Sequence, residues 1–185
     1  MLYAPGVVDT SFLREALGLP SLADERLGDD GEALRVIYGP TYHANVAITV
    51  RRVGELAELE ILVEGAAPER ELLAAGESAR PLGLLRQPID AWDACSRDGL
   101  AAHGERWDGR ARVLAHIDNP TPATEALAYQ LLVELLDFAA ARPWSGRTRD
   151  ALANVRCYLE DLDERPPSHR QARRQRQLAS QRGRA

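Results

Sequence analysis

The sequence predicts an α+β protein in which helices pack on an antiparallel sheet. Two observations support this class. Apolar and polar residues alternate with a period of two in the first third of the chain and around an Asp-Gly turn near residue 108. Two long segments with the apolar spacing of helices follow. The expected element order is α-βββ-α-ββ-αα, with about five strands. The 185 residues suffice for one such domain and a tail.

The first elements are a short helix and three strands. Residues 10–18 read as a helix that Thr10 or Ser11 can cap and that Gly18 ends. A first strand contains Leu34, Val36 and Tyr38 and breaks at Gly39-Pro40. In the two strands that follow, the side chains expected to face inward are Ala44, Val46, Ile48, Val50, Ala57, Leu59, Ile61 and Val63. The opposite side of the second strand would carry His43, Asn45, Thr49 and Arg51, and Arg52–Glu55 has the length of a hairpin connection.

The middle of the chain is predicted to contain short helices and a hairpin. Glu69–Ala75 is a possible helix, and Ile89–Ala94 is a second one because Pro88 suits a first helical turn. Residues 98–117 form a hairpin whose Asp108-Gly109 pair fits a two-residue turn with positive φ at both positions. Its returning strand would place Val113, Ala115 and Ile117 on one face.

Two helices complete the predicted domain. The longer one is expected to start with Thr121 as N-cap and Pro122 in the first turn, and to stop before Pro143. The last is expected from Thr148 to Asp163, on an apolar stripe that includes Leu152 and Leu159. Pro166-Pro167 then ends the fold, which gives a globular domain at 1–164 and a tail at 165–185.

Charge divides the chain at the same place. Residues 165–185 hold seven arginines and no acid, whereas residues 1–164 hold 16 arginines against 28 acids. The tail composition is typical of a disordered, solvated end, or of one that is partly helical over Gln171–Ser180. The alternative is a phosphate-binding arm that contacts nucleic acid through its arginine cluster. Its candidate residues are Arg170, Arg173, Arg174 and Arg176.

Cysteine use and hydropathy favour a cytoplasmic protein. Cys95 and Cys157 are isolated thiols that we expect to be reduced, although a single bridge between them stays possible. The start of the chain has no signal-peptide pattern, and no segment approaches the ~18 apolar residues of a membrane span.

No motif for catalysis or metal binding is present. The four histidines lack metal-ligand spacing, although His43 and His116 lie on predicted strands and could share a face. No nucleophile elbow or phosphate-binding loop occurs. We therefore expect no catalytic residue, no metal and no cofactor. The least favoured hypothesis is an enzyme whose site is assembled from Asp98, His103, His116 or Glu60.

Outward-facing acids are the candidate partner-binding residues. Glu58 and Glu60 alternate with apolar residues on the third strand, and Asp90 and Asp93 share a face of the predicted middle helix. Two carboxylates on one strand have the geometry of an acid–base pair. A solvated, charged docking surface is the simpler interpretation, and we expect these four residues to contact a protein partner.

Residues 97–140 carry a weak resemblance to known proteins. The stretch Arg97–Leu100, the turn at Trp107–Arg110, and Asn119-Pro120 before an apolar helix form one pattern. It resembles small bacterial α+β proteins of the immunity-protein type, which occur in toxin–immunity pairs. The element order also resembles class I type III secretion chaperones, small acidic dimers that hold an unfolded effector segment and generally lack an Arg-rich tail.

These observations favour a non-catalytic binding protein that acts as a monomer or homodimer. The leading hypothesis is an immunity-type inhibitor whose acidic body covers a basic surface of a toxin enzyme. The second is a secretion chaperone for an effector segment. The third is a nucleic-acid-associated regulator that uses the tail.

Overall fold

The computed structural model describes residues 9–25, 27, 30–92, 99–120, 122 and 125–164. It is an α+β structure around one seven-stranded sheet in the order β4-β3-β2-β1-β6-β7-β5. The elements are α1 (Phe12–Ala16), β1 (Gly31–Pro40), β2 (Val46–Val53), β3 (Leu56–Val63), β4 (Glu69–Leu73), α2 (Ala79–Leu82), β5 (Ile89–Trp92), β6 (Leu100–Trp107), β7 (Arg112–Asp118), α3 (Ala126–Ala140) and α4 (Gly146–Glu164).

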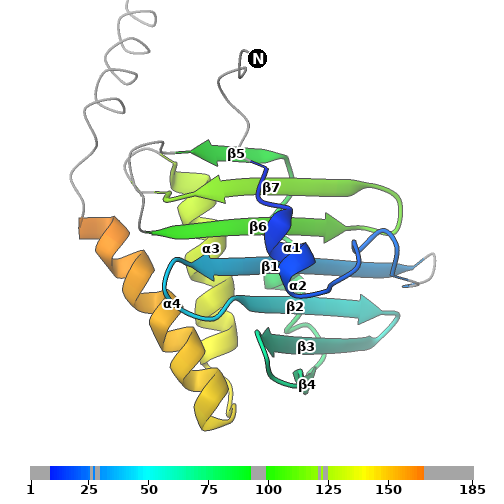
Figure 1. The fold of residues 1–185 in the computed structure, drawn as a ribbon. Helices are drawn as coiled ribbons and strands as arrows, with labels where there is room; N and C mark the ends of the chain where they lie inside the picture. Colours follow the sequence, from blue (N-terminus) through cyan, green and yellow to red (C-terminus); the bar gives the residue numbers. More distant parts are fainter. Residues whose placement is uncertain are drawn as a thin grey trace, which may run out of the picture.

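The helices lie on both sides of the sheet. Figure 1 shows α3 behind the strands, α4 beside the left-hand ends of the strands and α1 in front of β1 and β6. We call the side with α2, α3 and α4 the helix face, and the opposite side the α1 face. Side chains on a strand point alternately to these two faces. Each strand therefore contributes one set of residues to the helix-face core and another to the α1 face.

The helix face holds the main hydrophobic core, as the alternation predicts. The side chains predicted to face inward on β1, β2, β3 and β7 all belong to this core or pack against it, with one exception. Ala44 lies before the start of β2 and is exposed. From the helices, Leu131, Leu135 and Leu159 pack against the inward-facing strand residues. The Tyr38 hydroxyl donates a 2.9 Å hydrogen bond to the Leu132 carbonyl, which ties β1 to α3.

The predicted helix at Glu69–Ala75 is wrong, because Glu69–Leu73 forms strand β4. It pairs antiparallel with β3, with Leu73 opposite Ala57 and Glu71 opposite Leu59. A segment of seven residues is too short to hold a helix without tertiary support, so pairing with the free backbone groups of β3 decides its conformation. Glu69 accepts hydrogen bonds from the Ser145 N–H (3.0 Å) and hydroxyl (2.6 Å), which joins β4 to the start of α4.

The predicted helix at Ile89–Ala94 is also wrong. Ile89–Trp92 forms edge strand β5, which pairs in parallel with β7, so the sheet is mixed and has seven strands instead of about five. Ile89 lies opposite Ala115, and Ala91 is buried opposite Ile117. The β-branched Ile89 suits this strand, and pairing with β7 outweighs the helix-start signal of Pro88. The prediction for Asp93 and Ala94 lies outside the described residues.

The short first helix is confirmed, but its cap differs from the prediction. No side-chain cap bond forms at Ser11; instead, the Ser11 N–H donates a 2.9 Å hydrogen bond to the Asp9 carboxylate. Gly18 ends the helix with φ of +64°. Gly39 on β1 allows α1 to approach, because a Cβ there would come within 2.4 Å of Leu13 Cδ2.

The two long helices occur where the sequence predicts them, with shifted starts. The chain makes a turn at Pro122, and α3 begins only at Ala126; Thr121, the predicted cap, lies outside the described residues. Helix α4 begins at Gly146, two residues before the predicted start. Cys157 is a free, exposed thiol on α4. Cys95 and the tail at 165–185 lie outside the described residues, and no helix in the described ranges is long and apolar enough to cross a membrane.

The β6–β7 hairpin is confirmed, but its turn is longer than predicted. Trp107 pairs with Arg112, which leaves a loop of four residues, Asp108–Ala111. The Asp108 carboxylate accepts hydrogen bonds from the N–H groups of Arg110 (3.1 Å) and Ala111 (2.8 Å), and these bonds lower its pKa. Only Gly109 has positive φ in this loop, at +86°. The Asp108 carboxylate, and not a second positive φ, therefore fixes the turn.

We expect Gly109→Val to lower the free energy of unfolding by about 1–3 kcal/mol, because a β-branched residue is strained at this φ. Urea unfolding checks the effect, with Ala111→Val as the control that adds a larger side chain in the same loop. Equal unfolding midpoints for the two variants would show that backbone strain at residue 109 is not the cause.

Candidate functional site

The α1 face carries a network of alternating charges that crosses the sheet. Its centre is Arg35 on β1, which is fully buried. Its Nε donates to the Thr49 hydroxyl (3.2 Å), its Nη1 donates to the Pro20 carbonyl (2.8 Å), and its Nη2 pairs with Glu25. We call the following set the ion-pair network: Glu25, Arg35, Arg51, Glu58, Glu60, Arg70, Glu105 and Arg112.

Glu105 on β6 is the buried acid of the network. One carboxylate oxygen lies 3.9 Å from Arg35 Nη1, and the other lies 2.5 Å from Arg112 Nη2. The carboxylate also accepts hydrogen bonds from the Ser21 hydroxyl (2.9 Å) and the Leu22 N–H (3.3 Å). The segment after α1 therefore closes over this carboxylate, and its hydrogen-bonding capacity is used within the fold.

Glu60 is not the solvated carboxylate that the strand pattern predicts. Its side chain pairs with Arg51 (3.0 Å) and Arg70 (2.6 Å), and the residue is only 6% exposed. Burial alone would raise the pKa of Glu60, but the two guanidinium groups outweigh burial and lower it. Glu58 is half-buried, and its Oε1 lies 3.9 Å from Arg51 Nη1 and 3.8 Å from Arg70 Nε. Both acids are thus paired with arginines that belong to neighbouring strands.

An exposed apolar cluster lies next to this part of the network. Val53, Leu56 and Leu72 are 49%, 74% and 75% exposed. Val53 pairs with Leu56 across the β2–β3 hairpin, and Leu72 on β4 pairs with Glu58, two residues beyond Leu56. All three side chains therefore project from the α1 face at one corner of the sheet.

Acidic residues border this apolar cluster. Glu55 lies in the hairpin turn between Val53 and Leu56, and Asp30 precedes Gly31, which pairs with Val53. Glu58 borders the cluster on the third side. We call Val53, Leu56 and Leu72, with Asp30, Glu55 and Glu58, the corner surface. An apolar centre with a charged rim is the usual composition of a protein-binding surface.

The corner surface stays exposed because α1 and its following segment cover only the middle of the sheet. Leu13 packs on Ile37 and Ala47, and Leu22 is buried beside Glu105. Edge strand β4 carries Glu69, Arg70 and Glu71 along its length, and charges of this kind oppose pairing with another strand. A partner would therefore bind the face of this corner and not extend the sheet.

A histidine pair lies under the chain just before α1. Thr10 N–H donates to His116 Nδ1 (3.2 Å), and the Thr10 hydroxyl lies 3.2 Å from the same nitrogen and 3.4 Å from His103 Nδ1. The two rings are 5.2 Å apart between centroids. Burial lowers the pKa of His103 to about 4, although Glu105 acts in the opposite direction. The contacts of Thr10 therefore fasten the N-terminal segment to β6 and β7, and the buried His103 ring is neutral at pH 7.

The sequence pattern suggested the wrong histidine pair. His43 is exposed on the loop before β2, where its ring meets Tyr158 edge-on at 5.7 Å, so it does not face His116. Within the described residues no group of three or more His, Cys, Asp or Glu side chains is arranged to hold a metal. Thr10 and His103 are both buried.

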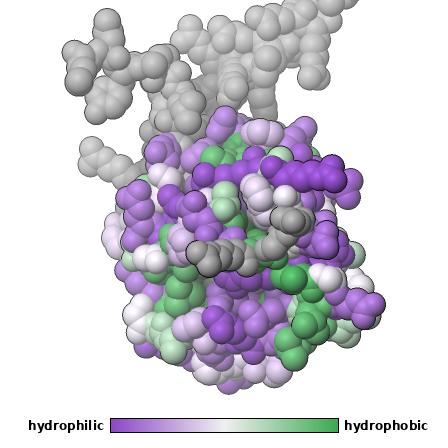
Figure 2. All heavy atoms as spheres, turned by 90° about the vertical axis from the view of Figure 1, so that its right-hand side faces the viewer, coloured by the Kyte–Doolittle hydropathy of each residue, from purple (hydrophilic) through white to green (hydrophobic). Residues whose placement is uncertain are grey.

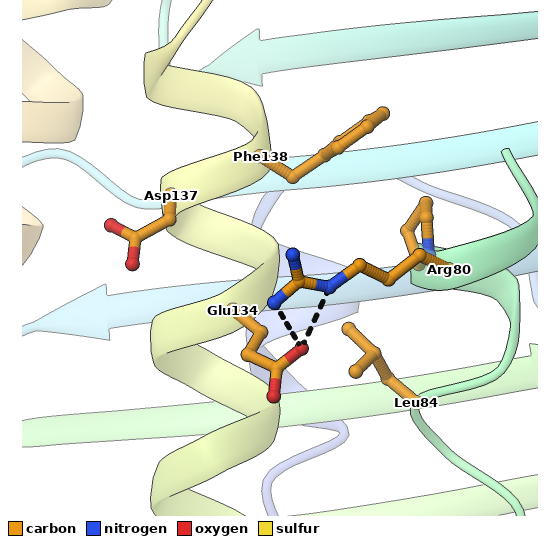
Figure 3. A pocket seen from close by; sticks show the side chains of 6 residues that line it. Arg80, Leu84, Glu134, Asp137 and Phe138 are labelled. Carbon is orange, nitrogen blue, oxygen red and sulfur yellow. Dashed lines mark hydrogen bonds and ion pairs between the residues drawn. The ribbon is translucent and has the colours of Figure 1, made fainter. Parts of the chain in front are cut away.

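A small hollow on the helix face is occupied by an ion pair. It lies between α2 and α3, has a volume of about 180 Å³, and is lined by Arg80, Pro81, Leu84, Glu134, Asp137 and Phe138. Figure 3 shows the Arg80 guanidinium reaching Glu134, while Asp137 points away from it. The two Arg80–Glu134 hydrogen bonds are 3.2 and 3.0 Å long. Arg80 thus neutralises Glu134, the acid of this hollow that faces it.

The three predicted partner-binding acids that the structure describes, Glu58, Glu60 and Asp90, do not form one surface. Asp90 is exposed on edge strand β5, whereas Glu58 and Glu60 lie on β3, and four strands separate them. At ~4.8 Å between neighbouring strands, the two sites are roughly 24 Å apart. Asp93, Asp98 and the tail arginines Arg170, Arg173, Arg174 and Arg176 lie outside the described residues.

The buried arginine at the centre of the network was not among the predicted site residues. Arg35 alternates with Val36 on β1, so the pattern placed it on an outer face. Its charge partner Glu105 is opposite it only because β1 pairs with β6. A signal was present, since Arg35 lies between the core-facing residues Leu34 and Val36, but only strand order brings it opposite Glu105.

The fold and this surface define an α+β protein with a mixed seven-stranded sheet and an exposed corner. A scan against protein-family models and searches of curated proteins and of solved structures found no match to this chain.

Proposed function

We propose that this chain is a non-catalytic protein-binding module, of the immunity type, that inhibits a basic toxin enzyme by covering part of its surface. The corner surface is the contact region. The observation that carries the proposal is the cluster of Val53, Leu56 and Leu72, exposed together on one face and bordered by acids. Leucine side chains exposed to this extent on a regular element cost solvation unless a partner covers them.

Charge supports a basic partner. Residues 1–164 have a net excess of acids, 28 against 16 arginines. Asp30 and Glu55 on the rim are exposed, and no arginine of the described residues pairs with either one. A long-range acidic field speeds association with a basic protein, and complementary rim charges select against other partners. Apolar contact at the centre would then supply slow dissociation.

The pairing of the carboxylates supports a binding role over an acid–base role. Glu58 and Glu60 both lie beside Arg51 and Arg70, and Glu60 has a lowered pKa. A general acid at neutral pH needs a raised pKa instead. The network thus keeps this part of the sheet rigid beneath the corner surface, which reduces the ordering cost of binding.

Replacing Leu56 and Leu72 together by Arg should weaken partner binding, because it removes the apolar centre and adds charge that repels a basic protein. We expect at least a tenfold loss of affinity, about 1.4 kcal/mol. The matched control is Leu127→Arg, an equally polar change at a 58% exposed leucine on α3. The experiment captures proteins from the native host on wild type and both variants, identifies them by mass spectrometry, and titrates the purified candidate.

The proposal requires a basic protein that binds wild type and the Leu127 variant, that is lost in the corner variant, and whose enzymatic activity falls when it is bound. A partner that binds all three proteins equally would exclude the corner surface. Capture of an extended effector segment would favour the secretion-chaperone alternative. Binding of generic duplex that disappears on replacing Arg173, Arg174 and Arg176 by Ala would favour the nucleic-acid regulator.

A further inference from the structure

A second hollow, on the helix face at the end of the sheet where β2 and β6 stop, is lined mainly by arginine. It has a volume of about 430 Å³ and is bordered by Glu32, Arg52, Ala79, Leu82, Gly83, Arg86 and Arg106. We call it the arginine hollow. Figure 2 views the molecule from this end of the sheet, where the surface is mostly hydrophilic and hydrophobic side chains gather in separate small groups. The hollow lies on the opposite sheet face from the corner surface.

The end of α2 orients two of the guanidinium groups. Arg106 Nε donates to the Leu82 carbonyl (2.9 Å), and Arg86 Nε donates to the next carbonyl, that of Gly83 (3.0 Å). Helix ends leave such carbonyls without partners, so both arginines satisfy them. Each guanidinium is held through its Nε, so its terminal Nη groups can donate to other acceptors. One Nη group of Arg106 lies 3.8 Å from the Asp108 carboxylate.

The arginine hollow has an excess of positive charge. Arg52 pairs with Glu32 at 2.8 Å, and Glu32 is the only acid that lines the hollow among the described residues. The nearest described carboxylate to Arg106 is Asp108, at 3.8 Å. Arg86 is paired with none of the carboxylates in the described ranges. The three guanidinium groups thus have two carboxylates beside them among the described residues, Glu32 and Asp108, and Arg86 supplies the excess positive charge.

We propose that the arginine hollow binds the phosphomonoester group of a small molecule. Planar guanidinium groups bind phosphate oxygens through paired N–H donors, and such charge-assisted bonds are about twice as strong as neutral ones. The hollow falls within the ~300–1,000 Å³ typical of small-molecule sites, so it has space for the rest of an ester beside the phosphate. This site is separate from the corner surface and does not depend on the protein partner.

Isothermal titration of the full chain with inorganic phosphate, and separately with adenosine monophosphate at the same ionic strength, tests the proposal. We expect both probes to bind wild type. Arg86→Gln should weaken both by about tenfold, because one charge-assisted contact is lost. Arg86 is the chosen position because it is exposed, so its replacement leaves the core unchanged. Thermal unfolding of the variant checks that the fold is intact.

The matched control is Arg80→Gln, which removes an exposed arginine of the neighbouring helix α2 that pairs with Glu134 outside the arginine hollow. It should bind both probes like wild type. Tighter binding of the nucleotide identifies an ester as the ligand, and equal binding identifies free phosphate with the same chemistry. Absence of binding to wild type, unchanged binding in Arg86→Gln, or an equal loss in Arg80→Gln would overturn the proposal. So would binding of generic duplex in preference to both probes.

Discussion

Replacing Arg35 by Met is expected to lower the free energy of unfolding by about 3–5 kcal/mol, the largest effect we expect from a single substitution in this chain. Arg35 is fully buried and contacts Glu25, Thr49 and the Pro20 carbonyl. Its removal leaves the buried Glu105 carboxylate with less compensating charge, and it removes the donor that holds the segment after α1 to the sheet. An unpaired charge inside a fold costs far more than a lost surface contact.

Urea unfolding of three variants tests this expectation. Arg70→Met removes an arginine of the same network whose side chain is 58% exposed, so we expect a loss of less than ~1 kcal/mol. The double variant Arg35→Met with Glu105→Leu should be more stable than Arg35→Met alone, because no buried carboxylate is left behind. Equal destabilisation by Arg35→Met and Arg70→Met would mean that the segment around Pro20 does not bury Arg35 in solution.

The second large effect is a loss of stability in mild acid caused by His103. Burial lowers its pKa in the folded protein to about 4, against about 6.5 in an unfolded chain. Between these two values the unfolded chain binds the proton more tightly, so stability falls as the pH falls from 6.5 towards 4. The expected loss is on the order of 3 kcal/mol. Above pH 6.5 His103 is neutral in both states and contributes no slope.

His103→Leu should remove this slope, since leucine cannot bind a proton and suits a buried position. His43→Leu is the control, because His43 is exposed and its loss should leave the slope unchanged. Glu60 and Glu69 have lowered pKa values, so their contributions are complete above their ordinary value of 4.5 and are lost below it. Denaturant midpoints measured from pH 7.5 to 4.5 therefore isolate His103. A wild-type midpoint that stays constant over this range would contradict the assignment.

Local patterns predicted much of the fold. Alternation along β1, β2, β3 and β7 correctly identified their core-facing side chains, because a strand buried on one face repeats every two residues. The stripe on α4 and the hairpin before α3 were also correct. The two wrong helices, at β4 and β5, are short segments whose few residues carry no clear period. Their conformation is decided by the neighbouring strand, which lies elsewhere in the sequence.

At the candidate site, too, the local pattern predicted which residues share a face but not which residues pair with them. The sequence placed Glu58 and Glu60 side by side on one strand and away from the main core, and the structure agrees. It did not show that Arg51 and Arg70 flank them, because those pairings depend on the order β4-β3-β2. Likewise, the sequence pattern placed Asp90 on a helix. In the structure Asp90 lies on strand β5, at the edge of the sheet opposite β4.

The amino-acid sequence by itself determined the α+β class, the core-facing residues of most strands, and the acidic character of residues 1–164. These follow from local periodicity and composition, which need no knowledge of distant contacts. Tertiary structure alone decided that Arg35 is buried against Glu105, that His103 meets His116, and that Leu56 and Leu72 share an exposed corner. Such pairs are far apart in the chain or separated by a turn, so only strand order and register bring their side chains together.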